Sequence, residues 1–165
     1  METQKPDIEA NFSWVLEGKL AGCSLPGNYP SPLEQDLRFL GQEKGVTAIV
    51  SLTPQALDEG KVNEAGMKTY VHIPVEDYYP PSQEQMKQFA EIVDQNEATV
   101  VHCNAGRGRT GTMLAAYLVL KKGMTGEEAI AFVKNVRKTY IQTNKQEDAL
   151  KQLYASITAS TESTS

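Results

Sequence analysis

One stretch of ten residues, 102–111, most constrains what this chain can fold into. It lies between the short apolar run Thr99–Val101 and the longer apolar run Met113–Leu120, and it contains three glycines. A short apolar run, a glycine-bearing loop and a longer apolar run together indicate a buried strand, a tight turn and a helix. We therefore expect Cys103 at the end of a strand and Arg109 at the start of a helix.

The backbone of such a loop can bind an anion. Successive N–H groups in a tight turn form a concave nest, and the N-terminus of a helix adds partial positive charge. The residues expected to bind phosphate are Asn104, Ala105, Gly106, Arg107, Gly108 and Arg109. The planar guanidinium of Arg109 can bind two phosphoryl oxygens at once, which a lysine cannot do. The field of the nest also stabilises the thiolate of Cys103, and a thiolate is a strong nucleophile.

Two neighbours of this loop have expected supporting roles. The hydroxyl of Thr110 can donate a proton to the sulfur of Cys103, which helps the sulfur to leave when an intermediate breaks down. His102 is expected to brace the loop from behind by hydrogen bonding. The nest and Arg109 already supply positive charge, so this chemistry needs no metal and no cofactor.

The stretch resembles the signature loop of the cysteine-based protein tyrosine phosphatase superfamily, and its dual-specificity branch is the better match. Further segments resemble the small VHZ-type atypical dual-specificity phosphatases. The first of these segments comprises residues 11–16 and 19–22, the second residues 50–53, and the third residues 110–119. The resemblance covers residues 11–157, and it implies hydrolysis of phosphate monoesters on proteins through a phosphocysteine intermediate. Phosphotyrosine is the first expected substrate, followed by phosphoserine and phosphothreonine.

A phosphocysteine mechanism also needs a proton donor for the leaving group, usually on a mobile loop. The segment 73–82 follows an expected strand, so it should leave the same edge of a parallel sheet as the Cys103 loop. Asp77, which is followed by two residues and a proline, resembles the general acid of the family, and Glu76 is its competitor. Alternatively, both lie in a solvated acidic turn. Tyr78 and Tyr79 either line the substrate cleft or pack beneath the loop.

Hydrolysis of the intermediate requires a positioned water. The segment 141–146 resembles the glutamine-bearing loop that positions this water in tyrosine-specific phosphatases, which makes Gln142 and Gln146 candidates. Thr143 and Gln146 also have the spacing of a helix capping box, so Gln146 has an alternative, structural interpretation.

Strands that alternate with helices indicate an α/β fold: a single domain with a central, mostly parallel sheet and helices on both faces. Residues 1–10 are expected to be an N-terminal extension, 11–157 the catalytic domain, and 158–165 a disordered Ser/Thr tail. The expected strands are 12–16, 19–22, 46–52, 69–73 and 99–102. The expected helices are 31–44, with Ser31 as its cap, and then 58–64, 83–95, 110–122, 126–138 and 145–157.

Composition and charge limit the binding partners and the cellular location that can be expected. A net charge of −5 argues against general nucleic-acid binding. The longest apolar run is too short to span a bilayer, and the N-terminus lacks the apolar core of a signal peptide. Two cysteines do not make a disulfide framework, so a cytoplasmic location, extending to the nucleus, is expected. In some relatives a nearby cysteine forms a reversible disulfide with the nucleophile. Cys23 could do so here, or it could be a free buried thiol.

Four functions remain open. The first is a monomeric phosphatase acting on a phosphorylated protein or peptide. The second is a phosphatase for a phosphoinositide or an RNA 5′ phosphate, because a basic residue at 107 is similar to lipid-phosphatase loops. The third is a phosphate-reading pseudophosphatase, against which Cys103, Arg109 and Asp77 argue. The fourth is another cysteine-loop enzyme, such as a sulfurtransferase or arsenate reductase. The histidine before Cys103 and the Thr-Gly pair after Arg109 disfavour it.

Overall fold

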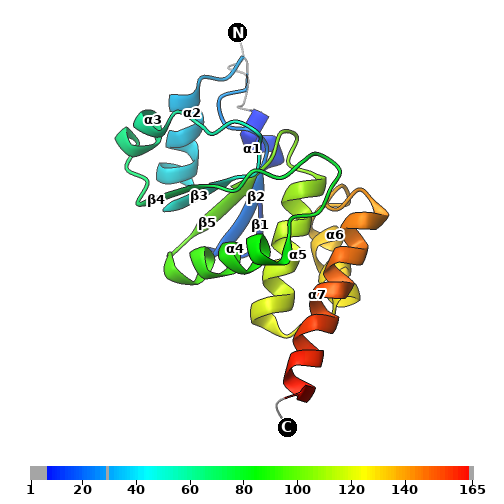
Figure 1. Ribbon diagram of the computed structural model, residues 1–165. Helices are drawn as coiled ribbons and strands as arrows, with labels where there is room; N and C mark the ends of the chain where they lie inside the picture. Colours follow the sequence, from blue (N-terminus) through cyan, green and yellow to red (C-terminus); the bar gives the residue numbers. More distant parts are fainter. Residues whose placement is uncertain (1–6, 29, 164–165) are drawn as a thin grey trace.

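The computed structural model describes residues 7–28 and 30–163, and its centre is a five-stranded sheet (Figure 1). The strand order is β1-β2-β5-β3-β4. The strands are β1 Ser13–Leu16, β2 Leu20–Cys23, β3 Ala48–Ser51, β4 Thr69–His72 and β5 Thr99–His102. β1 pairs antiparallel with β2, and every other pairing is parallel. Because β5 pairs with both β2 and β3, the loop that follows β5 leaves the middle of the sheet.

Helices cover both faces of this sheet, as Figure 1 shows. The helices are α1 Asp7–Asn11, α2 Leu33–Arg38 with its π-helical continuation η1 Phe39–Glu43, α3 Glu59–Glu64, α4 Gln83–Gln95, α5 Gly108–Lys122, α6 Gly126–Val136 and α7 Asn144–Ser163. The first three and η1 enclose a smaller core on one face, and α4 to α7 enclose the larger core on the other. The predicted α/β fold is therefore confirmed. None of the helices in the described ranges is long and apolar enough to cross a membrane.

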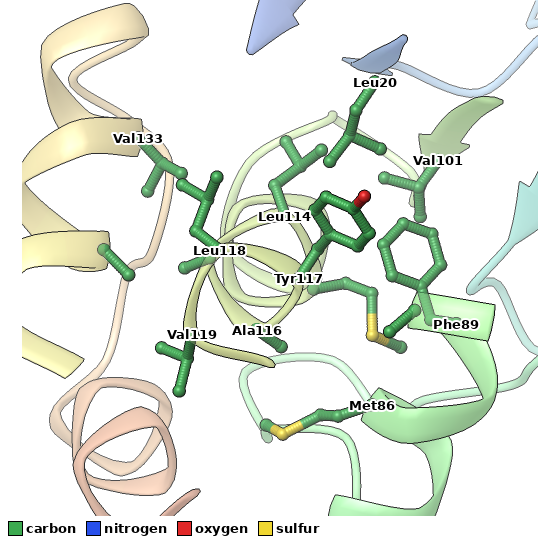
Figure 2. Close-up of a cluster of buried hydrophobic side chains, with 14 of the residues drawn as sticks. Leu20, Met86, Phe89, Val101, Leu114, Ala116, Tyr117, Leu118, Val119 and Val133 are labelled. Carbon is green, nitrogen blue, oxygen red and sulfur yellow. The ribbon is translucent and has the colours of Figure 1, made fainter. Parts of the chain in front are cut away.

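The larger core is built around α5, whose residues from Gly108 to Val119 are all buried. Figure 2 shows side chains of this helix, among them Leu114 and Leu118, gathered with Leu20 of β2 and Phe89 of α4. A helix that is apolar on all sides has to be covered on all sides. The helix that carries Arg109 is thus held rigidly by the core.

Several predicted helix boundaries differ from those of the structure. Ser31 does not cap α2: the N-cap is Pro32, and the hydroxyl of Ser31 donates instead to the Asp36 carboxylate at 2.6 Å. Helix α5 begins at residue 108 rather than 110, and α6 ends at residue 136 rather than 138. Capping boxes at Ser82 and Thr125 begin α4 and α6, as their Ser-x-x-Gln and Thr-x-x-Glu spacings favour.

Parts of the two predicted terminal segments belong to helices of the fold. The predicted Ser/Thr tail, 158–165, continues α7 as far as residue 163, because no glycine or proline interrupts the helix after residue 144. The hydroxyl of Thr158 donates to the carbonyls of Tyr154 and Ala155, one turn back in this helix. At the other end, residues 7–10 of the predicted extension belong to α1, and Ile8 is fully buried. Residues 1–6 and 164–165 lie outside the described part of the chain.

Gly111 lets α5 approach the segment before α7 very closely. A Cβ atom at this position would lie 2.7 Å from the Cα of Tyr140 and 2.8 Å from the backbone nitrogen of Ile141. Both are backbone atoms, which cannot move aside as the end of a side chain can. The absence of a side chain at 111 therefore brings Gln142 up to the N-terminus of α5.

We predict that Gly111→Ala lowers the free energy of unfolding by about 1–3 kcal/mol, because the added methyl overpacks the helix contact. Gly60→Ala is the matched control, since Gly60 is exposed in α3 and its new Cβ would lie 3.3 Å from the Asp58 side chain. The free energy of unfolding of this control should rise by up to about 1 kcal/mol, because alanine has a higher helix propensity than glycine. Urea unfolding of both variants measures the difference, and an unchanged midpoint for Gly111→Ala would contradict the close contact.

Candidate active site

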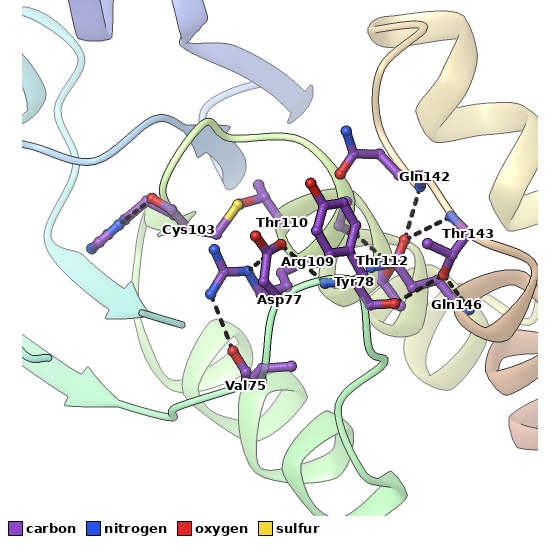
Figure 3. A network of polar contacts seen from close by, with 12 residues as sticks. Val75, Asp77, Tyr78, Cys103, Arg109, Thr110, Thr112, Gln142, Thr143 and Gln146 are labelled. Atoms are coloured by element: carbon purple, nitrogen blue, oxygen red, sulfur yellow. Dashed lines mark hydrogen bonds and ion pairs between the residues drawn. The ribbon is translucent and has the colours of Figure 1, made fainter. Parts of the chain in front are cut away.

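Cys103 lies directly after β5, with its side chain only 3% exposed. Its sulfur accepts a hydrogen bond from the Thr110 hydroxyl at 3.0 Å (Figure 3). Gly106 turns the loop with φ of +72°, and a Cβ there would lie 2.7 Å from the carbonyl oxygen of Cys23. On the same side, the Leu25 N–H donates to the Asn104 carbonyl at 2.9 Å. The predicted strand, loop and helix are present, and β2 supports the loop from one side.

His102 supports the loop from the sheet. Its Nδ1 lies 3.0 Å from the Cys103 carbonyl, and because a carbonyl can only accept, the proton is on Nδ1. Its Nε2 therefore accepts from the Ser51 hydroxyl at 2.5 Å, and Ser51 in turn accepts from the Tyr70 hydroxyl at 2.7 Å. Burial lowers the pKa of His102 to about 4, so the ring is neutral at pH 7. The bracing role expected for His102 agrees with these contacts.

Arg109 is 5% exposed and connects two loops. Its Nη1 donates to the carbonyl of Val75 at 3.1 Å, and its Nε lies 3.5 Å from a carboxylate oxygen of Asp77 (Figure 3). Nε is buried and has no hydrogen-bond partner among the described residues. Buried guanidinium groups are normally satisfied, so a phosphoryl oxygen beside Cys103 would supply the acceptor that this atom needs.

The loop of residues 73–82, here called the acid loop, carries the two competing carboxylates. Asp77 lines the same cavity as Cys103 and Arg109, a cavity of about 210 Å³. Glu76 lines a neighbouring groove of about 660 Å³ but not the cavity. The geometry therefore favours Asp77 over Glu76. Neither tyrosine packs beneath the loop: Tyr78 lines the cavity and is 58% exposed, and Tyr79 is 44% exposed.

The two candidate glutamines differ in position. Gln142 is exposed and lines the Cys103 cavity. Gln146 is fully buried, and its Oε1 accepts from the backbone N–H groups of Gln142 and Thr143 at 2.8 and 3.2 Å. The Gln146 N–H in turn bonds the Thr143 hydroxyl at 3.2 Å, which completes the capping box. Gln146 thus shapes the start of α7, and Gln142 is the one that reaches the cavity.

Arg107 is exposed beside the cavity. It lines the Cys103 cavity and also an adjoining polar one of about 300 Å³, which includes Ser24, Asn28 and Asn104. Its guanidinium has no hydrogen-bond or ion-pair partner within the described ranges of the chain. It can therefore interact with a group attached to a phosphate bound at Cys103.

Both cysteines are free. Burial raises the pKa of the Cys23 thiol well above its usual value, with smaller contributions from Cys103 and Asp36. A protonated thiol is a poor nucleophile for disulfide exchange. A redox pairing of Cys23 with Cys103 stays a prediction. The described residues contain no group of three or more His, Cys, Asp and Glu side chains able to bind a metal ion.

Comparison with known proteins decides the family. Residues 9–150 match the family model of the Swiss Army Knife protein, DSP-PTPase phosphatase domain. The chain belongs to this dual-specificity phosphatase family. The superfamily and its dual-specificity branch, identified from the loop, are confirmed, and the VHZ-type subfamily stays a prediction.

Curated relatives of this phosphatase family are longer than the chain. Tyrosine-protein phosphatase cdc-14 of Caenorhabditis elegans is 31% identical over 135 residues, which is 77% of this chain and 19% of that protein. Phosphatidylglycerophosphate phosphatase PTPMT1 of Arabidopsis thaliana is 30% identical over 154 residues, or 89% of this chain and 44% of that protein. The chain spans less than half the length of either relative.

Solved structures share the fold of this phosphatase domain. The active form of Tk-PTP superimposes with a TM-score of 0.73 at 25% identity, covering 92% of this chain and 99% of that one. Kinase associated phosphatase gives a TM-score of 0.76 at 22% identity, covering 94% and 99%. At the latter identity the likeness shows the fold alone.

Sequence reasoning missed the groups that hold the acid loop of the phosphatase domain. The carbonyls of Val75 and Tyr78 accept from Arg109 and Thr143, and Lys145 lies over the ring of Tyr79. Backbone carbonyls carry no sequence signal, since every residue has one. The cation–π pair joins residues far apart in the chain, which no local pattern reveals.

The buried, neutral His102 predicts a loss of stability in acid. Its pKa is about 4 in the folded protein against 6.5 as the ordinary value, so the unfolded chain binds the proton first. The contribution of neutral His102 to the free energy of unfolding is complete above pH 6.5, and it is lost as the pH falls from 6.5 toward 4. The full loss is about 3 kcal/mol.

Urea unfolding between pH 7 and 4 tests this prediction, with His102→Asn as the variant that cannot titrate. The stability advantage of the wild type over the variant should shrink as pH falls. In NMR spectra, the ring signals of His102 should stay constant between pH 5 and 8. A midpoint near pH 6.5 for this ring would show that it is not protected as the structure indicates.

Proposed function

We propose that this chain hydrolyses phosphate monoesters on proteins through a phosphocysteine intermediate. The observation that carries the proposal is one cavity lined by a buried cysteine, a buried arginine and an aspartate. Cys103 supplies the nucleophile, Arg109 the anion site and Asp77 the acid. The family match to a phosphatase domain and the relatives named as protein phosphatases support it.

In the first step, the Cys103 thiolate attacks phosphorus, an S–P bond forms and the bond to the leaving oxygen breaks. Asp77 donates its proton to that oxygen as it leaves. The backbone N–H groups of residues 104–109 and the guanidinium of Arg109 stabilise the charge on the equatorial oxygens.

In the second step, Asp77 takes a proton from a water, and the water oxygen attacks phosphorus. The S–P bond breaks, and the sulfur leaves as a thiolate that accepts the Thr110 hydrogen bond, as it does in the structure. Gln142 is the residue we assign to position that water, because its side chain lines the cavity. Gln146 keeps its part in the capping box.

A second candidate substrate class is favoured by one observation, the position of Arg107. Arg107 lines both the Cys103 cavity and the polar cavity beside it, so it could bind a second polar group of a phospholipid or a nucleotide end. The Arabidopsis relative is named as a phosphatidylglycerophosphate phosphatase, and one structure of PTPMT1 holds PI(5)P. We propose phosphoproteins as the first substrate class and phospholipids or nucleotide ends as the second. We also propose that the protein is a monomeric enzyme of the cytoplasm or nucleus.

The nucleophile is tested by Cys103→Ser, which should lower turnover of an aryl phosphate by roughly a thousandfold or more. Binding of a phosphate analogue such as tungstate should survive, because the nest and Arg109 remain. Cys23→Ala is the control, since it removes the chain's other thiol and should leave turnover close to wild type. Steady-state kinetics and calorimetry give the two readouts. Substantial activity in Cys103→Ser would contradict the mechanism.

The substrate class is tested with a phosphotyrosine peptide, a phosphothreonine peptide and PI(5)P in mixed micelles. We expect the highest kcat/KM for the phosphotyrosine peptide, with Arg107→Met changing this value less than threefold. If PI(5)P is instead preferred, and Arg107→Met removes that preference, the lipid candidate replaces the protein one. Tight peptide binding with no turnover of any substrate would point to a phosphate-reading module.

A further inference from the structure

The first half of the acid loop is anchored to the sheet, because the N–H groups of Ile73 and Val75 donate to the carbonyls of Ser51 and Leu52 at 2.8 and 3.0 Å. Its tip, residues 76–79, has fewer contacts with the rest of the molecule. Tyr78 has φ of +68°, a backbone conformation that costs a residue with a side chain on the order of 1 kcal/mol. The hydrogen bonds within the turn, from the Tyr79 N–H to the Glu76 carbonyl at 3.1 Å and from the Tyr78 N–H to Asp77 at 3.0 Å, shape the turn without attaching it to anything else. Asp77 in this tip faces Arg109 at 3.5 Å, and further contacts from outside the loop are needed to hold the backbone of the tip over the cavity.

The start of α7 provides two such contacts. The Thr143 hydroxyl donates to the Tyr78 carbonyl at 3.0 Å, and the Lys145 ammonium lies 4.6 Å from the centre of the Tyr79 ring. Figure 3 shows Tyr78 between Asp77 on one side and Thr143 on the other. These two contacts are made to the two residues that follow Asp77, so they fix the backbone that aims its carboxylate.

The same segment is fixed relative to the Cys103 loop. The Thr143 hydroxyl also accepts from the Gln146 N–H, so one hydroxyl both caps α7 and holds the acid loop. A Cβ at Gly108 would lie 2.8 Å from the Gln142 side chain and 2.9 Å from that of Gln146. The start of α7 therefore packs directly on the start of α5, which carries Arg109.

We propose that Thr143 and Lys145 are positioning residues that hold the acid loop closed, with Asp77 facing Cys103 and Arg109. The inference rests on the proposed role of Asp77 as the general acid. Without these contacts the loop opens more often, and Asp77 leaves the cavity. Thiolate attack on a substrate with a good leaving group needs no acid, so it should be spared.

The experiment compares kcat/KM for phenyl phosphate, whose leaving group needs a proton, with that for 4-nitrophenyl phosphate, whose leaving group does not. Lys145→Met keeps the apolar stem and removes the cation. Thr143→Asp keeps an acceptor for the cap and removes the donor. From the usual size of an exposed cation–π contact and a hydrogen bond, each should lower the phenyl phosphate value roughly threefold, and both together about tenfold. The 4-nitrophenyl phosphate value should change less than twofold.

Three matched variants control for the cation, for the hydroxyl donor and for the loss of a positive charge from α7. Lys145→Arg keeps a cation over the ring, and Thr143→Ser keeps both the donor and the acceptor, so both should behave as wild type. Lys151→Met removes one exposed positive charge from the same helix. It should leave the ratio between the two substrates unchanged.

A cycle with Asp77→Asn separates positioning from a general structural effect. If Thr143 and Lys145 act only through Asp77, Lys145→Met should have no further effect on phenyl phosphate hydrolysis in the Asp77→Asn background. Equal losses for both substrates, losses that persist without Asp77, or no loss for phenyl phosphate would each overturn the proposal. If Asp77→Asn alone did not favour the better leaving group, the assignment of the acid would fail instead, and the two failures are thus distinguishable.

Discussion

The site depends on one buried guanidinium. Arg109 is fixed in the first turn of a helix that is buried on all sides, and it reaches across to the acid loop through the Val75 carbonyl and the Asp77 carboxylate. A buried charge costs free energy unless its surroundings compensate it. The contacts that Arg109 makes are also those that bring the acid to the nucleophile, and within the described residues they leave Nε without a hydrogen-bond partner. The same group therefore binds the anion and assembles the cavity.

Much of this arrangement could be predicted from the sequence, because it depends on local patterns. The apolar run before Cys103 and the apolar run after Arg109 predict the strand and the helix, and the capping boxes at Ser82 and Thr125 mark their helices correctly. Such patterns express backbone preferences within a few residues. They carry no information on which distant segments meet.

The predictions that failed or stayed open are those that depend on tertiary contacts. Ser31 has the spacing of a cap, but the helix begins one residue later with Pro32 at the N-cap, and the Ser31 hydroxyl donates to the Asp36 carboxylate instead. Glu76 and Asp77 are neighbours in sequence and separate only when the turn at Tyr78 directs one of them into the cavity. Gln142 and Gln146 are four residues apart, but Gln142 precedes α7 and is exposed, whereas Gln146 lies in the first turn of α7, where it is buried and accepts from backbone N–H groups.

Several of the bonds that hold the loops of the site end on backbone atoms. The Leu25 N–H bonds the Asn104 carbonyl, and the Leu52 N–H bonds the His102 carbonyl. Val75 and Tyr78 likewise contribute carbonyl oxygens. A backbone atom stays in place when its side chain changes, provided that the strand or loop keeps its path. The chain can therefore diverge at these framework positions, and reshape the groove walls around the cavity, while the reacting atoms keep their places.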